Sequence, residues 1–325
     1  MSLRALALAA LAVSVPAAAR GYVRSSDGDT NACLYWKPRS VTYHVNTGRA
    51  ASSASCGPAT ASNSPAAAAI EAGFSAWTGA QQACTDLSLV RGADSTSTKL
   101  GFTQGGSNEN LIVFRKGWCS NDDLAKTDPC FTNPSIRCGD TFNCFENTGS
   151  LGGTSIIALT TTTYSPASGE IVDADMEFVD WTGLSSGAAI SGTRPQGWYF
   201  TCATPAGNAC VNYGEESCYS MDLQNTATHE VGHFIGFAHV PVSEAESTMH
   251  PTAAVGEVKK RSLEADDVTG LCAVYPKAAA TLTCVTPKKK SSGGCGTAGG
   301  LGALGLLAAL ALPRRRKPHR TTTPA

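Results

Sequence analysis

The run His229-Glu230-Val231-Gly232-His233-Phe234-Ile235-Gly236-Phe237-Ala238-His239 decides how this chain of 325 residues is interpreted. On a helix, His229 and His233 lie one turn apart on one face, where two neutral imidazoles can bind the same Zn²⁺. Glu230 follows the first histidine and can reach that face as a general base. Gly236 stands where the helix has to end and turn, which a residue that tolerates positive φ does cheaply. The turn brings back His239 as a third ligand, and three protein ligands leave a fourth position for water, as in catalytic zinc sites.

The alternative to a metal site is a buried structural cluster of histidines. Such a cluster has no need of an acid beside it, and Glu230 has no packing reason to be there. The full spacing HExxHxxGxxH adds two required residues to the short HExxH pattern, so a chance match is much rarer. The sequence therefore favours a zinc site with a base beside it.

Charge is unevenly distributed along the chain, although the net charge is only −1. Residues 20–276 contain 15 Lys and Arg and all 26 Asp and Glu, which gives 15 − 26 = −11. Beyond Pro276 there are nine basic residues and no acidic ones. An acidic body of this kind makes nucleic-acid binding an unlikely function. With 42% hydrophobic residues, the body is large enough for a packed core.

Residues 1–19 have the pattern of a secretory signal peptide, with Arg4, an apolar stretch over 5–15 and Ala17-Ala18-Ala19 as the cleavage site. A buried N-terminal helix is the alternative. Export agrees with thirteen cysteines, which we interpret as disulfides that staple a domain with its own core. Cys295 stands apart in a glycine-rich stretch, and without it the number of cysteines is even.

Hydrophobic patterning and capping signals predict a mixture of strands and helices. A Cys-rich insertion over 115–150 is expected to be irregular and stapled by disulfides. The expected strands cover 41–46, 87–90, 111–114, 154–162 and 170–179; the expected helices open at Ser64-Pro65, open near Ser220 or Asp222, and cover 263–274 with Ser262 as N-cap.

Two later segments resemble a known protease family. Ser247-Thr248-Met249-His250-Pro251 resembles the methionine turn of metzincin proteases, in its matrixin form. Residues 263–275, which include Asp266 and Asp267, resemble the last helix of the matrixin catalytic domain, and 169–178 is a weaker match to the strand before the active-site helix. The resemblance implies an α+β fold, with a twisted mixed five-stranded sheet, an active-site helix and a C-terminal helix. It also implies that Met249 forms an apolar floor beneath the zinc.

The chain departs from that family in its N-terminal region. Only about twenty residues separate Ala19 from the first expected strand, too few for the folded propeptide whose cysteine usually caps the zinc. Arg137-Cys138-Gly139-Asp140 is similar to that capping motif but lies inside the body, so we expect Cys138 to be half of a disulfide. Capping by Cys33 is the less favoured alternative.

The C-terminal region divides into a linker, residues 277–296, and an apolar segment followed by an Arg cluster, residues 297–325. As a helix, residues 297–312 would span about 24 Å, slightly less than a ~30 Å hydrocarbon layer. Together with Gly294-Cys295-Gly296, this segment resembles the C-terminal sorting tail of myxobacterial surface proteins, which implies processing or lipid attachment at Cys295 and a transient or lasting membrane association. A disordered tail is the alternative.

These observations predict that residues 20–276 form an exported or surface-attached zinc endopeptidase that acts on proteins or peptides. By resemblance, the substrate would lie extended along an edge strand near residues 155–159. Asp173, Asp175 and Glu177 alternate on one strand, so either a structural Ca²⁺ or a solvated acidic face is expected there. The competing functions are a surface binding module on a protease fold, and a zinc hydrolase of a non-protein amide.

Overall fold

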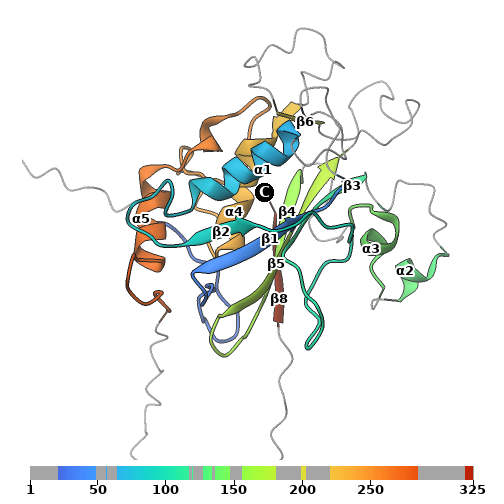
Figure 1. Ribbon diagram of the computed structural model, residues 1–325, viewed down its shortest axis with the longest axis horizontal. Helices are drawn as coiled ribbons and strands as arrows, with labels where there is room; N and C mark the ends of the chain where they lie inside the picture. The colour runs from blue at the N-terminus through green and yellow to red at the C-terminus, as the bar shows by residue number, and fades with distance from the viewer. Residues whose placement is uncertain are drawn as a thin grey trace, which may run out of the picture.

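The computed structural model describes residues 21–48, 56, 64–116, 119, 127–133, 136–146, 156–180, 199–202, 220–284 and 319–324. A twisted sheet forms one layer, and the helices α1 (Pro65–Ala76) and α4 (Leu223–Phe234) cover one of its faces (Figure 1). The last helix, α5 (Ala265–Val274), packs beside this layer. The architecture is α+β, as the sequence analysis predicts.

The sheet has the strand order β2-β1-β3-β5-β4-β8. β1 (Ser40–Val45) pairs in parallel with β2 (Ser88–Arg91) and β3 (Leu111–Lys116), and β3 pairs in parallel with β5 (Ile171–Asp180). β4 (Ala158–Tyr164) is antiparallel to β5. These five strands confirm the predicted mixed five-stranded sheet.

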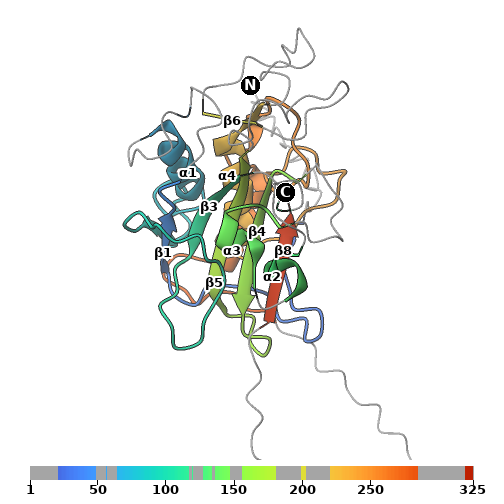
Figure 2. The ribbon, with the colours of Figure 1, turned by 90° about the vertical axis from the view of Figure 1, so that its right-hand side faces the viewer.

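A sixth strand, β8 (His319–Pro324), was not expected from the sequence. It pairs antiparallel with β4 over Tyr164 to Leu159 and forms the edge of the sheet there (Figure 2). The last residues of the described chain therefore lie beside the strand that would otherwise end the sheet.

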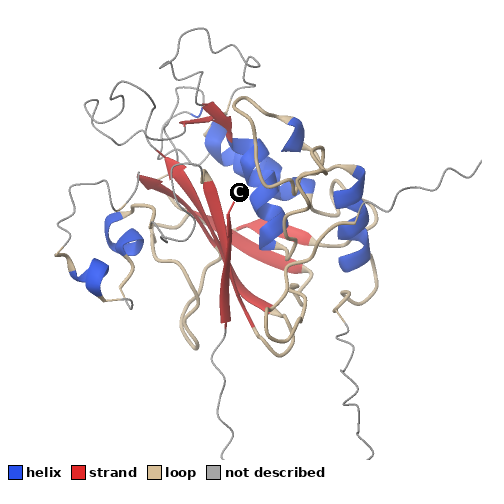
Figure 3. Ribbon diagram, turned by 180° about the vertical axis from the view of Figure 1, so that it is seen from behind, coloured by secondary structure: helices blue, strands red, loops and turns tan. Residues whose placement is uncertain are grey.

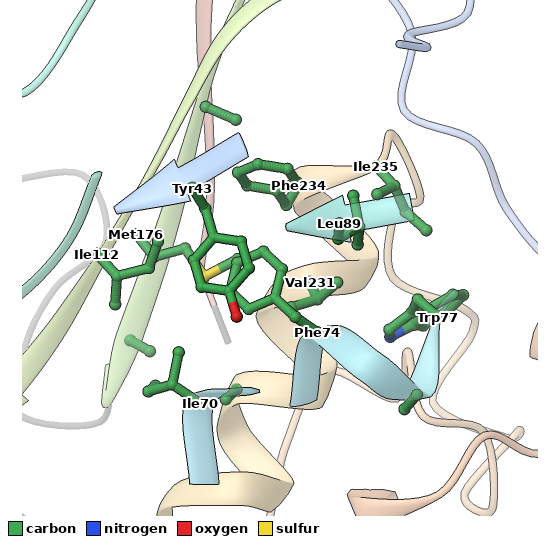
Figure 4. Close-up of a cluster of buried hydrophobic side chains, with 14 of the residues drawn as sticks. Tyr43, Ile70, Phe74, Trp77, Leu89, Ile112, Met176, Val231, Phe234 and Ile235 are labelled. Atoms are coloured by element: carbon green, nitrogen blue, oxygen red, sulfur yellow. The ribbon is translucent and has the colours of Figure 1, made fainter. Parts of the chain in front are cut away.

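Helix α1 forms as its start signals predict, because the Ser64 hydroxyl accepts a hydrogen bond from the Ala67 amide and Pro65 occupies the first turn. Its apolar stripe, with Ile70, Phe74 and Trp77, is completely buried. The stripe packs between the sheet and α4 in the main hydrophobic core (Figure 4). The core thus fixes α4 against the sheet.

Helix α4 follows the short strand β7 (Ser220–Asp222), which pairs in parallel with β6 (Tyr199–Thr201). Asp222 caps its first turn by accepting a hydrogen bond from the Asn225 amide at 2.7 Å. At the other end, the Phe237 amide donates to the Gly232 carbonyl and the Gly236 amide donates to the His233 carbonyl, which is a Schellman ending. Gly236 has a φ of 92°, and a Cβ there would lie 2.4 Å from the Leu34 carbonyl oxygen.

The Cys-rich insertion lies on the far side of the sheet from α1 and α4, and contains the short helices α2 (Pro129–Thr132) and α3 (Cys138–Phe142) (Figure 3). The disulfides Cys119–Cys144 and Cys130–Cys138 staple it, so Cys138 is a disulfide half, as expected. Three more disulfides join distant segments of the body: Cys33–Cys284, Cys56–Cys202 and Cys84–Cys272. Cys33 is therefore not available as a cap on zinc.

Two boundaries differ from the predictions. The strand expected over 154–162 is β4 at 158–164, because the β-branched run continues to the turn that begins at Ser165. The N-cap of α5 is Glu264 rather than Ser262, because Glu264 and Asp267 form a reciprocal capping box, whereas Ser262 ends the short 3₁₀ helix η3 (Lys259–Arg261).

Several predictions fall outside the described residues, namely the signal peptide at 1–19, the apolar stretch 297–312 and the processing point Cys295. Within the described ranges, every helix is too short or too polar to cross a bilayer.

Candidate metal centre

Helix α4 and the turn after it bring His229, His233 and His239 together. His229 and His233 are adjacent on the buried face of the helix, and the Gly236 turn returns the chain so that the His239 ring faces both. The Nε2 atom of His239 lies 3.2 Å from that of His229 and 3.1 Å from that of His233. Among the described residues, these three side chains form the group whose ligand atoms could hold a metal ion.

The outer ring nitrogens of two histidines are bound to backbone carbonyls. Nδ1 of His229 lies 2.6 Å from the Thr248 carbonyl oxygen, and Nδ1 of His233 lies 2.8 Å from that of Phe237. A carbonyl oxygen can only accept, so each Nδ1 carries the proton and donates it. Both Nε2 atoms then present lone pairs to the centre, which is the arrangement that metal-binding histidines need.

The three nitrogens are spaced as the ligands of a Zn²⁺ ion would be. In a tetrahedral zinc site, ligand nitrogens about 2.05 Å from the ion lie about 3.3 Å from one another. The two shortest separations here, 3.1 and 3.2 Å, are close to this value.

Burial keeps the three imidazoles in the neutral form that a metal ligand requires. It lowers the pKa of His233 to about 3 and that of His239 to about 4, and the pKa of His229 falls well below its usual value. The main cause is desolvation, which disfavours the charged imidazolium, and the neighbouring histidines and Lys260 act in the same direction. Protons therefore do not compete for these nitrogens near neutral pH.

Glu230 lies beside this centre, completely buried between α4 and β4. One carboxylate oxygen, Oε2, accepts a short hydrogen bond from the Thr160 hydroxyl. The other, Oε1, has no hydrogen-bond partner among the described residues. Burial raises the pKa of Glu230 to about 8, against the opposing effects of Thr160 and Lys260. A cation on the histidines would lower this pKa again, because positive charge favours the carboxylate.

The segment around Met249 packs against helix α4 and is itself held by the last helix, α5. Asp267, which is buried in the first turn of α5, accepts hydrogen bonds from the Ser247 hydroxyl and the Thr248 amide. The Thr248 carbonyl in turn holds the His229 ring. Asp266, the other acid of this turn, is only half-buried. The chain of contacts from α5 to His229 is thus carried by Asp267.

Met249 packs directly against α4 at Gly232. A Cβ at Gly232 would lie 2.1 Å from the Met249 sulfur, so any larger residue at this point of the helix would have to displace the Met249 side chain. Met249 itself is buried, with an exposed fraction of 2%. Met249 therefore packs on the helix that carries His229 and His233, and its role as an apolar floor beneath the zinc stays a prediction.

The acids on β5 are engaged by protein groups. Asp175 accepts hydrogen bonds from the Gly101 and Leu111 amides, at 2.6 and 2.9 Å. Glu177 forms ion pairs with Arg115 at 2.7 Å and Arg137 at 3.3 Å. All three acids, Asp173 included, are buried, so this is not a solvated acidic face. A calcium ion there stays a prediction.

Three residues of the site were missed from the sequence. Thr160 is one of four consecutive threonines, and nothing in the run marks the one that meets Glu230. Lys260 lies in Lys259-Lys260-Arg261, which looks like a solvated charge cluster, yet its side chain is only 3% exposed. Gly232 falls within the decisive run, but only the position of Met249 shows why a glycine is needed.

Comparison with known proteins agrees with this geometry. Residues 162–276 match the matrixin family. The chain is 39% identical over 66 residues to the Metalloendoproteinase 4-MMP of Arabidopsis thaliana, a match that covers 20% of this chain and 18% of that protein. It is 41% identical over 56 residues to the Metalloendoproteinase 2-MMP of the same plant, covering 17% and 14%. Each of these two matches spans less than a fifth of the relative's length. The similarity to the matrixin family covers residues 162–276, which include α4 and its histidines.

Proposed function

We propose that this protein is a zinc-dependent endopeptidase. The observation that carries the proposal is the convergence of three neutral histidine nitrogens beside a buried carboxylate, next to strand β4, which pairs with an added antiparallel strand. His229, His233 and His239 would hold the ion. Zinc bound there would polarise the substrate carbonyl and lower the pKa of water to about 7.

Glu230 acts as the general base and then as the general acid. Its Oε1 atom has no partner among the described residues, so it is free to take a proton from the attacking water and to return it to the leaving amine. The Thr160 hydroxyl holds the other oxygen, Oε2, and so fixes the carboxylate in one orientation.

The peptide substrate would bind along β4, antiparallel to it. Strand addition at a sheet edge supplies backbone hydrogen bonds without requiring a particular sequence. The pairing of β8 with β4 supports this, because it is an antiparallel strand at the same edge. Since Thr160 contacts Glu230, the scissile bond would lie beside the middle of this strand.

The function is tested by zymography of the full-length protein on casein, with and without 1,10-phenanthroline, and by the substitution Glu230→Gln. We expect a chelator-sensitive band, and a variant that retains zinc by elemental analysis but loses most turnover. Glu246→Gln is the matched control, because the Glu246 side chain is 66% exposed and pairs only with Lys259 on the surface. Undiminished proteolysis by Glu230→Gln would contradict the assigned base.

The same experiment separates the competing functions. A protein that binds zinc but cleaves no protein or peptide would favour a surface binding module, and cleavage of small amides alone would favour a non-protein substrate. We also propose that the protein acts outside the cytoplasm. Five disulfides in the described chain support this, because such bonds persist in oxidising compartments.

A further inference from the structure

A very small pocket adjoins the candidate metal centre on the side of His229. Its volume is about 10 Å³, which is roughly the space that one water molecule needs. The walls come from four segments of the chain: the residues are Ile157 before β4, Asn225 and Thr226 on α4, Pro251 and Ala253 after the methionine turn, and Lys260 on η3.

The buried side chain of Lys260 forms part of the wall of this pocket and is held in place by its own loop. Its ammonium group donates hydrogen bonds to the carbonyl oxygens of His250 and Thr252, both at 2.8 Å, and lies 3.8 Å from the Glu257 carboxylate. Its backbone amide donates to the Asn225 side chain at 2.8 Å. Two of the three ammonium hydrogens thus have acceptors within the chain, and the Glu257 carboxylate lies within ion-pair distance of the third.

The direction of the substrate places this pocket relative to the scissile bond. A chain antiparallel to β4 runs from the Tyr164 end toward the Ala158 end, as β8 does. It passes Thr160, and therefore Glu230, before it reaches Ile157 in the pocket wall. The pocket consequently faces the residue that follows the scissile bond.

We propose that Lys260 closes this pocket and restricts the residue after the scissile bond to small side chains, namely Gly, Ala and Ser. The inference rests on the proposed peptidase function and adds a substrate class to it. Lys260 acts by occupying volume, and its ammonium group is held by two carbonyls of its own loop and paired with Glu257. A larger side chain such as Leu has no space to enter.

The test is a quenched-fluorescence peptide library, varied at the residue after the scissile bond, with the full-length protein and two variants. We expect the unsubstituted protein to cleave before Ala at least about tenfold more efficiently than before Leu, in kcat/KM, which is the discrimination that pocket size alone can provide. Lys260→Ala removes the plug, so the preference should shift toward Leu and Phe. Lys260→Met keeps the stem and removes the charge, so the preference for small residues should remain.

The outcomes separate this inference from the proposed function. If the protein cleaves before Asp or Glu and Lys260→Met does not, the lysine charge selects the substrate. If the unsubstituted protein cleaves equally well before Leu and Ala, the pocket opens to admit large side chains. Either result overturns the inference and leaves the peptidase intact. Absence of any cleavage would instead contradict the proposed function. Melting curves and zinc content check that both variants are folded.

Discussion

The hydrogen bond from Thr160 to Glu230 gives a prediction that can be worked through in detail. The substitution Thr160→Val keeps the shape of the side chain and removes its hydroxyl, so Oε2 of Glu230 loses its donor. A hydrogen bond to a charged group contributes about 1.5–3 kcal/mol, which corresponds to about 1–2 pKa units. Because this bond favours the ionised carboxylate, its removal raises the pKa of Glu230.

The assay is the pH profile of kcat/KM on a quenched peptide. Below its pKa, Glu230 is protonated and cannot accept the proton of water, so a higher pKa moves the acid limb of the profile to higher pH. On that limb we expect kcat/KM to fall by about 10–100-fold, and at high pH the variant and the unsubstituted protein should converge. Zinc content should not change, since the three histidines are untouched.

The matched control is Thr161→Val. Thr161 is the next residue of β4 and equally buried, but its hydroxyl has no hydrogen-bond partner among the described residues. Its acid limb should coincide with that of the unsubstituted protein. If Thr160→Val left the acid limb in place, the hydroxyl would not control the ionisation of Glu230. A loss of equal size at every pH would instead indicate a purely geometric role.

Three further predictions concern stability and access to the site. Gly232→Ala should lower the melting temperature and the zinc affinity, because the added Cβ would lie 2.1 Å from the Met249 sulfur and overpacking costs about 1–3 kcal/mol. The control is Gly28→Ala, whose added Cβ meets nothing within 4 Å. Equal effects of the two substitutions would refute the argument. Loss of the Cys84–Cys272 disulfide should destabilise the fold more than loss of Cys130–Cys138. Their sequence separations of 188 and 8 correspond to about 5 and about 2.5 kcal/mol of chain entropy for isolated loops. Calorimetry of the two Cys→Ser double variants measures this, and an equal loss of stability in both would contradict the prediction. Removal of residues 319–325 should increase the initial rate of peptide cleavage, because β8 occupies the edge of β4 where a substrate would add, and an unchanged rate at equal zinc content would count against this.

Much of the fold was predictable because its signals are local. Ser64-Pro65 and Asp222 start α1 and α4 by capping interactions over three residues, and Gly236 ends α4 through a conformation that glycine adopts readily. The boundary of β4 was wrong by several residues, because β-branched residues on both sides of position 158 give no periodic signal. The N-cap of α5 was wrong because Ser is a favoured cap residue in sequence and Glu is not, so Ser262 was preferred to Glu264.

The sequence alone determined that His229, His233 and His239 can meet and that Glu230 accompanies them, because helical periodicity and one glycine turn act within eleven residues. The tertiary structure decided what surrounds them. Thr160 reaches Glu230 across 70 residues, and Lys260 reaches α4 across 35. The C-terminal strand β8 reaches β4 from much further along the chain. Such contacts form because the packed core places whole helices and strands next to one another. The spacing of residues along the sequence does not reveal which elements will be neighbours.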